Sequence, residues 1–421
     1  MTSKAIGGIG ENVGRPAIAS ERVTELDVLR GFALFGVFLA NLVKPISWNL
    51  LATSEQMAAL PSQPVDNVFV FLINVFIADK SNTLFAFLFG LGFYIQMERL
   101  SKRGVNFTAI YTRRLFILLV FGFVHLIFIW FWDILHLYAF CGFFLLVLRR
   151  ASDRFLLVMG LFLALTGRLV VDLWLNMSGT LDSLGVPVLY ESAAVLERQA
   201  ISQSGNYLGL LGNLFEINWK EYFLTGIAGW IFYVLGRFMI GIWVGRRGWL
   251  QNASQYLPGY RRVLWIALPT GLGIELVGQG IGWAINQHLV SGGVWEVLLS
   301  TCHMTATPFM ATGYACLIVL GLRTGLGHLL LSPLAAVGKM ALTNYVAQSF
   351  IIGFVLLGIG PGLNLAGQIG IAHLTYVAII AFGGQILFSH LWLQRFAFGP
   401  LEWVWRGLTY GHFPPLVRAD R

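Results

Sequence analysis

The chain has 421 residues, of which 57% are hydrophobic and only 11% are charged. A soluble domain is roughly half apolar and about a quarter charged, so this composition is typical of a protein that crosses a membrane several times. The formal net charge of +8 does not indicate a nucleic-acid partner, because the basic residues form short clusters between apolar runs, where they set orientation in the membrane.

A membrane-spanning helix needs about 20 mostly apolar residues. By that rule the sequence predicts an all-α integral membrane protein, a polytopic bundle of about ten transmembrane helices with both termini cytoplasmic. The predicted helices lie near residues 26–47, 70–97, 114–131, 135–148, 155–176, 222–245, 263–285, 295–321, 333–357 and 368–393.

The domain organisation expected from this pattern is simple. Residues 1–21 are rich in small residues without an apolar centre, and predict a disordered cytoplasmic tail. A single transmembrane helical domain is expected over 22–411, followed by a short cytoplasmic tail over 412–421. Few polar residues interrupt the spans, apart from an Asp-Lys-Ser-Asn sequence at 79–82 in the second.

Lys and Arg fall mainly into one set of connections between the predicted helices. That set includes Arg99, Arg113, Arg149 and Arg246, whereas the opposite set has few basic residues. By the positive-inside rule the basic set is cytoplasmic. The connection over 177–221 is then an external segment, and the protein is expected in the cytoplasmic membrane.

The stretch FWDILH places Asp133 and His136 inside an apolar region. Arg114 and Arg149, both expected on the cytoplasmic side, bracket residues 115–148, which must cross the bilayer and return. With about four residues in the turn, each leg has about 15 residues, or roughly 22 Å of helix, against roughly 30 Å of hydrocarbon. The turn is therefore expected below the outer surface. Ionisable side chains at that depth indicate a cavity that opens from outside.

Asp133 and His136 suit acid–base catalysis. A carboxylate that accepts one imidazole N–H fixes the tautomer and stabilises the imidazolium that forms on proton abstraction. The alternative is an ordinary hairpin turn, in which Asp133 caps the next helix and His136 bonds to a carbonyl. His125, about 16 Å beyond Arg114 along the helix, is expected near the middle of the bilayer and is a third catalytic candidate.

Other polar residues inside the predicted spans are candidates for lining a cavity, namely Lys80, Glu275 and His303. His303 lies in STCHMTATP, where hydroxyl groups can also satisfy a proline-broken helix, so a structural role stays open. Arg168 and Arg237 lie deep in their spans and need partners. Either an Arg–Glu pair with Glu275 or a site for an anionic substrate would supply them.

Some polar residues favour structural roles. Asn344 and Gln348 are four residues apart on one helix face, which suits bonds between helices or to a ligand amide. Cys141, Cys302 and Cys316 lie in apolar runs without metal-ligand spacing, so no metal is expected. GxSxG, HExxH and P-loop motifs do not occur in the sequence. No sequence motif therefore supports a hydrolase, a zinc site or a nucleotide-binding site.

Several sequence blocks in a fixed order carry a family resemblance. They are RVTELDVLRGFALFGVFLANL (22–42), TLFAFLFGLGF (83–93), the run from YTRRLF to LLVLRR (111–150), GKMALTNYVAQS (338–349) and GPLEWVWRGLTYG (399–411). Together they resemble the YeiB/DUF418 family of bacterial membrane proteins. The opening LDxLRG block also resembles proteins of the heparan-α-glucosaminide N-acetyltransferase type, with which YeiB-like proteins are grouped in a transmembrane acyltransferase superfamily.

The resemblance implies a protein of the bacterial cytoplasmic (inner) membrane that passes an acyl group from cytoplasmic acyl-CoA to an acceptor at the outer face. The acceptor would be a hydroxyl or amine of a sugar, glycan or lipid. The loop after the first helix, where the heparan acetyltransferases keep a histidine, reads LVKPISWNLLATSEQ and has none, so His136 is the expected base or acyl carrier. The residues expected to bind the substrate or acyl-CoA are Asp27, Arg30, Asn41, Arg114, Lys339, Asn344 and Arg406.

An alternative function is a proton-coupled transporter or channel for a small solute. Asp133, His136, His125 and Glu275 would then relay protons or bind the solute. Under either function the expected partners are the lipid bilayer and small-molecule substrates, and the sequence is compatible with a homodimer.

Overall fold

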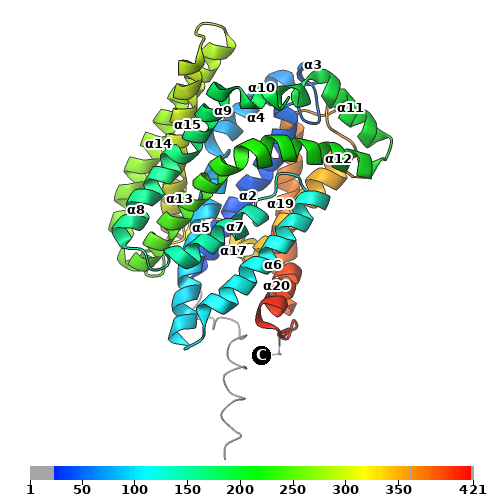
Figure 1. Cartoon of the computed structure of the whole chain (residues 1–421). Coiled ribbons are helices and arrows are strands. Elements are labelled where there is room, and N and C mark those ends of the chain that lie inside the picture. The colour runs from blue at the N-terminus through cyan, green and yellow to red at the C-terminus, as the bar shows by residue number, and fades with distance from the viewer. Residues whose placement is uncertain (1–22, 361, 419–421) are drawn as a thin grey trace, which may run out of the picture.

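The computed structural model describes residues 23–360 and 362–418 (Figure 1). The predicted tail over 1–21 and the last three residues of the predicted tail over 412–421 lie outside this part of the chain. The helices are α2 (Thr24–Ser47), α3 (Ser54–Ala58), α4 (Gln63–Phe76), α5 (Lys80–Lys102), α6 (Phe107–Phe128), α7 (Leu135–Leu148), α8 (Asp153–Phe162), α9 (Arg168–Ser178), α10 (Thr180–Ser183), α11 (Ser192–Gln203), α12 (Tyr207–Ile217), α13 (Ile227–Arg247), α14 (Leu257–Asn286), α15 (Gly293–Gly321), α16 (Gly325–Leu331), α17 (Leu334–Lys339), α18 (Ala341–Phe350), α19 (Ile371–Arg395) and α20 (Pro400–Tyr410).

Three π-helical segments continue helices of the bundle, namely η2 (Leu163–Gly167), η4 (Asn218–Gly226) and η6 (Ile351–Leu357), and two short 3₁₀ turns are η3 (Pro187–Tyr190) and η5 (Ala253–Gln255). Extended backbone in the described residues pairs at one isolated bridge, between Phe396 and Val417.

Eight segments of the described chain are long and apolar enough to cross a membrane. Two further apolar helices, α7 and the continuous α18–η6, are shorter. The 14 residues of α7 extend only about 21 Å, so this helix does not cross the bilayer alone. The prediction of an all-α polytopic membrane protein is confirmed, with two of the ten predicted helices falling short of a full span.

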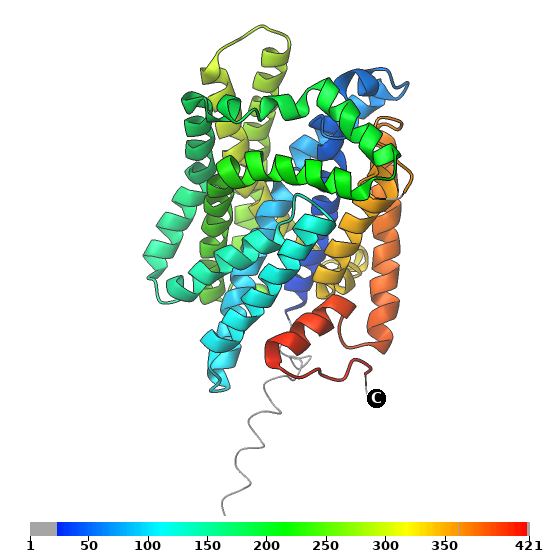
Figure 2. The same cartoon turned by 45° about the vertical axis from the view of Figure 1, so that its right-hand side comes forward.

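The basic connections gather at one end of the bundle, which we call the basic face. Arg149 donates to the Thr108 hydroxyl, and Arg246 donates to the Arg149 carbonyl at 2.8 Å. The indole of Trp405 in α20 donates to the carbonyl of Arg114 at 2.9 Å. Helix α20 and the described C-terminal residues lie at this end in both views (Figures 1 and 2).

The segment over 177–221 lies at the other end, which we call the opposite face. It folds into short helices that run across the bundle there (Figure 2). Arg198 of α11 donates to the Leu50 carbonyl at 2.8 Å, and Gln199 donates to the Leu51 carbonyl at 2.6 Å. These bonds tie the segment to the connection that follows α2.

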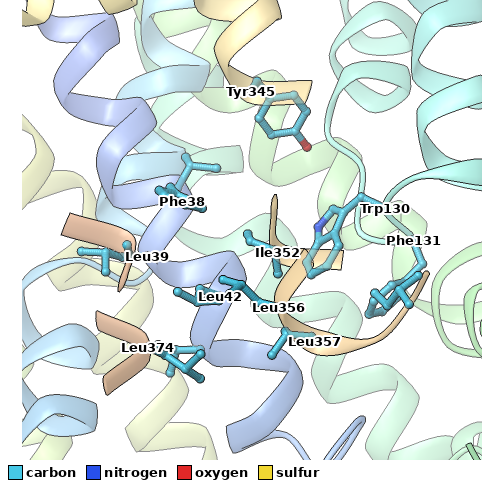
Figure 3. Packing of buried hydrophobic residues seen from close by; sticks show 14 of the residues in the cluster. Phe38, Leu39, Leu42, Trp130, Phe131, Tyr345, Ile352, Leu356, Leu357 and Leu374 are labelled. Carbon is cyan, nitrogen blue, oxygen red and sulfur yellow. The ribbon is translucent and has the colours of Figure 1, made fainter. Parts of the chain in front are cut away.

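The turn between α6 and α7 is buried in the apolar core. Trp130 and Phe131 belong to the largest core cluster, and the Tyr207 hydroxyl of α12 donates to the Phe128 carbonyl just before the turn. Figure 3 shows these two aromatic rings close to the side chains of α2, α18 and η6, among them Phe38, Leu42, Tyr345, Ile352, Leu356 and Leu357. Trp130 and Phe131 therefore hold the polar turn inside the protein.

A glycine lets α6 and α7 approach each other beside this turn. A Cβ added at Gly122 would overlap the backbone nitrogen and Cα of His136. Backbone atoms of a packed helix cannot swing aside as a flexible side chain can. The absence of a side chain at Gly122 therefore sets the distance between α6 and the first turn of α7.

We expect Gly122→Ala to destabilise the protein by about 1–3 kcal/mol, because an added methyl group forces α6 away from α7. Thermal unfolding of the purified protein in detergent measures the effect. Gly383→Ala is the matched control, since a Cβ at that position of α19 meets nothing within 4 Å and alanine favours helix by about 0.5–1 kcal/mol. Equal unfolding temperatures for the two variants would contradict the close approach.

Candidate functional site

The carboxylate of Asp133 is shared by two histidines. His125 Nδ1 lies 2.8 Å from one oxygen, and His136 Nδ1 lies 2.8 Å from the other. All three side chains are buried. An ionised carboxylate only accepts hydrogen bonds, so each Nδ1 carries the hydrogen and Nε2 is the basic nitrogen of each neutral ring.

Asp133 also caps α7. Its Oδ2 oxygen, which contacts His136 Nδ1, accepts from the backbone N–H of His136 at 2.8 Å as well. The two roles that the sequence left as alternatives, helix cap and partner of a histidine, are thus combined in one side chain. This double use fixes His136 both through its ring and through its backbone.

Tyr222 completes a chain of hydrogen bonds. Its hydroxyl lies 3.0 Å from Nε2 of His136, so the order is Tyr222–His136–Asp133–His125. Tyr222 lies in η4, and π-helical segments are frequent at functional sites. His125 Nε2 has no hydrogen-bond partner among the described residues, and its ring packs 5.1 Å from that of Tyr345.

A cavity of about 210 Å³ opens beside this chain in the half of the bundle nearer the opposite face. Asp133 and Tyr222 line it, whereas His136 is buried and does not. We call it the acceptor-side cavity, after the face at which the sequence resemblance implies an acceptor. Its wall also includes the polar side chains Asn41, Lys44, Asn82, Arg168 and Glu221 and the aromatic residues Trp48, Trp132, Tyr138, Trp230 and Tyr233.

A second cavity, of about 270 Å³, occupies the half nearer the basic face. We call it the basic-face cavity. Four cationic side chains predicted as donor-binding groups gather on its wall, namely Arg30, Arg114, Lys339 and Arg406. A surface cavity of about 220 Å³ shares Arg30, Lys339 and Arg406 with it and adds Asp27, which pairs with Arg30 at 3.5 Å.

Tyr138 lines both cavities. Its neighbours in the first turn of α7 divide between them, with Leu135 on the basic-face cavity and Leu137 on the acceptor-side cavity. Tyr345 lines the basic-face cavity, and its hydroxyl accepts from the backbone N–H of Ile134 at 3.3 Å. The two cavities therefore lie on either side of Tyr138 at the start of α7, and Asp133 lines the acceptor-side cavity.

Glu402 shapes the basic-face cavity from α20. Its carboxylate accepts from the backbone N–H groups of Leu342 at 2.6 Å and Thr343 at 3.1 Å, which are the first turn of α18. Burial raises the pKa of Glu402, and the hydrogen bonds from Thr343 and Leu342 oppose that rise. Glu402 thereby holds the break between α17 and α18 that presents Lys339 to the cavity.

The remaining candidates are placed elsewhere. Asn344 donates to Ser389 at 2.9 Å and lies between helices, as does Gln348, which donates to Gln385 at 2.9 Å. Asn41 lines the acceptor-side cavity rather than the cavity with the cationic groups. Within residues 23–360 and 362–418, His, Cys, Asp and Glu form no group of three or more that could hold a metal ion.

The Arg–Glu pair, one of the two alternatives for Arg168 and Arg237, does not form. Glu275 pairs with Lys80 at 3.0 Å and with His303 at 3.2 Å. Arg168 pairs with Asp172 at 3.4 Å, and Arg237 donates to the Thr83 hydroxyl at 2.8 Å. Lys80 is fully buried at the start of α5, and a buried cation needs a charge partner. Glu275 is that partner, so it does not pair with an arginine.

These features define a class of protein, a multi-pass helical membrane protein with a buried carboxylate–histidine cluster and two internal cavities on either side of Tyr138. The family model described as "Protein of unknown function (DUF418)" matches residues 244–412. The chain is 28% identical to "Uncharacterized protein YxaH" of Bacillus subtilis (strain 168), over 97% of this chain and 99% of the relative.

Two further relatives are similar over nearly their whole length. "Uncharacterized protein YeiB" of Escherichia coli (strain K12) is 29% identical over 94% of this chain and 98% of its own. A protein of Bacillus acidopullulyticus, "Uncharacterized 39.9 kDa protein in amylase 3'region", is 28% identical over 96% and 99%. These matches support the YeiB/DUF418 family that the sequence resembles.

Cysteine labelling tests whether the two cavities open to different sides. In a background with the three native cysteines replaced by alanine, we expect Asn41→Cys to react with a membrane-impermeant thiol reagent on intact cells. Gln96→Cys, from the basic-face cavity, should react only after permeabilisation, because the positive-inside rule makes that face cytoplasmic. Labelling of both positions from the same side would contradict the arrangement.

Proposed function

We propose that the protein is a membrane-embedded acyltransferase of the bacterial cytoplasmic membrane. It takes an acyl group from acyl-CoA at the basic face and passes it to a hydroxyl or amine acceptor, a sugar, glycan or lipid, that enters from the opposite face. The observation that carries the proposal is that both cavities border Tyr138, near the Asp133–histidine chain.

The charge of the basic-face cavity supports an acyl-CoA donor. Arg30, Arg114, Lys339 and Arg406 offer several cationic N–H donors around one cavity, and guanidinium groups bind phosphate oxygens through paired hydrogen bonds. Deeper in, the wall becomes apolar at Phe85, Leu88, Phe89 and Phe93. The phosphates of the donor would bind at the mouth, and its thioester arm would extend toward Tyr138.

The chemistry requires one bond to form and one to break. The acceptor oxygen or nitrogen attacks the thioester carbonyl carbon, a C–O or C–N bond forms, the C–S bond breaks and the CoA thiolate leaves. The acceptor proton passes to the Tyr222 oxygen as Tyr222 gives its own proton to His136 Nε2. Asp133 stabilises the resulting imidazolium, and that proton finally returns by way of Tyr222 to the thiolate, which leaves as the thiol.

A transporter is the second candidate, and one observation favours it. The two cavities lie toward opposite faces and are separated at Tyr138, an arrangement also expected when a substrate site alternates between two sides of a membrane. A transporter would move its solute across liposome membranes with no acyl donor present, whereas the acyltransferase would consume the donor.

We expect His136→Ala and Tyr222→Phe each to lower the turnover of acyl transfer by about 10²- to 10⁴-fold, because each breaks the relay that removes the acceptor proton. Transfer of a radiolabelled acyl group in proteoliposomes measures it. His373→Ala and Tyr376→Phe are the matched controls, since both side chains are exposed on α19. Undiminished transfer by the His136 and Tyr222 variants would remove the relay from the mechanism.

Donor binding should depend on the cationic groups of the basic-face cavity. We expect Arg30→Gln and Lys339→Gln each to raise the KM for acyl-CoA about tenfold or more, since a hydrogen bond to a charged group contributes about 1.5–3 kcal/mol. Arg154→Gln removes an exposed arginine from the same face and should leave KM unchanged. An equal effect of all three substitutions would indicate general surface attraction rather than a binding site.

A further inference from the structure

A second histidine–carboxylate cluster lies apart from Asp133. His303 of α15 is held between two carboxylates, with Nε2 3.0 Å from Asp79 and Nδ1 3.2 Å from Glu275. Asp79 precedes α5 in a left-handed backbone conformation, with φ of 60°, and Glu275 comes from α14. Three separate parts of the chain are thus joined through one imidazole ring.

The geometry of the ring fixes the number of protons in the cluster. Both ring nitrogens face carboxylate oxygens, and ionised carboxylates only accept hydrogen bonds. Both contacts are hydrogen bonds only when His303 is an imidazolium or when one of the two carboxylic acids is protonated. Either way, the arrangement holds one more proton than a neutral histidine between two ionised carboxylates.

Lysines at both ends of the cluster allow that proton to leave. Lys80 lies 3.0 Å from Glu275, and Lys44 lies 3.4 Å from Asp79. Gln279 donates to Glu275 at 3.1 Å. Each carboxylate therefore keeps a cationic partner when His303 becomes neutral. Loss of the proton removes one hydrogen bond of the ring but leaves neither carboxylate without a counter-charge.

The cluster is open to water on one side only. It lines a cavity of about 300 Å³ that shares Lys44, Trp48 and Arg168 with the acceptor-side cavity. The His303 side chain is 24% exposed, whereas those of Lys80 and Glu275 are 0% and 1% exposed. The other titratable or charged groups around the cluster among the described residues are Lys44 from α2, Arg168 and Asp172 from α9, Tyr233 and Arg237 from α13, and Cys302 and Tyr314 from α15.

We propose that Asp79, His303 and Glu275 form a proton-binding site that exchanges one proton with the cavity on the side of the opposite face. This site is separate from the Asp133–histidine chain and does not depend on the proposed acyl transfer. Release of the proton leaves a neutral His303, with Lys44 and Lys80 as the cationic partners of the two carboxylates. The charge of the cavity wall falls by one, and Lys44, which lines both cavities, is drawn toward Asp79.

Solid-state ¹⁵N NMR of the full-length protein in lipid bilayers tests the site directly. The chain has eight histidines, and selective ¹⁵N-histidine labelling reports the protonation of each ring nitrogen. We expect a doubly protonated imidazolium signal near pH 6 that is lost reversibly as the pH is raised to about 9. The signal of His303 is the one that is present in the wild-type protein and lost in His303→Gln, and it should be retained in the control His373→Gln.

A carboxylate substitution separates proton binding from a fixed ion pair. In Asp79→Asn the imidazolium signal should vanish at a pH lower than in the wild-type protein by about one unit or more, because one of its two acceptors has lost its charge. The proposal is overturned if no titrating imidazolium signal of the wild-type protein disappears in His303→Gln. If His303→Gln does not fold, the wild-type signals are assigned to individual histidines by backbone correlations, and a His303 ring that shows no titrating imidazolium overturns the proposal in the same way.

Discussion

The structure depends on the burial of one carboxylate, that of Asp133, with a histidine 2.8 Å from each of its oxygens. An isolated charge at this depth in a membrane is costly, and removal of a partner from a buried ion pair typically costs about 3–5 kcal/mol. The surrounding fold meets this requirement. Trp130 and Phe131 anchor the turn in the core, and α12 closes over it. Gly122 lets α6 approach closely enough to supply His125.

The two ends of the bundle place different chemistry on the two sides of this carboxylate. Cationic side chains surround the basic-face cavity, whereas aromatic rings and groups of both charges surround the acceptor-side cavity. Since Tyr138 borders both, a thioester from one side and an acceptor from the other would meet beside a positioned histidine. The proton-binding cluster at His303 lies on the acceptor side alone, where it adjusts charge without contacting the donor.

Helix arithmetic between two arginines predicted a recessed turn, and the turn is buried. The arithmetic holds for α7, which has 14 residues, but not for α6, which begins at Phe107 before Arg114 and is long enough to cross a membrane. The positive-inside rule likewise predicted that Arg30, Arg114, Lys339 and Arg406 would gather at one end, and they line one cavity. Tyr222 was missed because it lies 86 residues from His136 in sequence and reaches it from a π-helical segment, which has no distinct sequence signature. The Lys80–Glu275 and His303–Asp79 pairs were also missed. Pairing between helices depends on how each helix is rotated about its own axis, and hydropathy does not specify that rotation.

The central claim is that an acyl-CoA donor occupies the basic-face cavity with its reactive carbon beside Tyr138. A cryo-electron microscopy structure with a non-hydrolysable thioether analogue of acetyl-CoA tests this most directly. The account predicts density for the phosphates against Arg30, Lys339 and Arg406, and for the pantetheine arm running between Phe85 and Tyr345 toward Tyr138. Analogue density on the opposite face, or an empty basic-face cavity at saturating analogue, would contradict it.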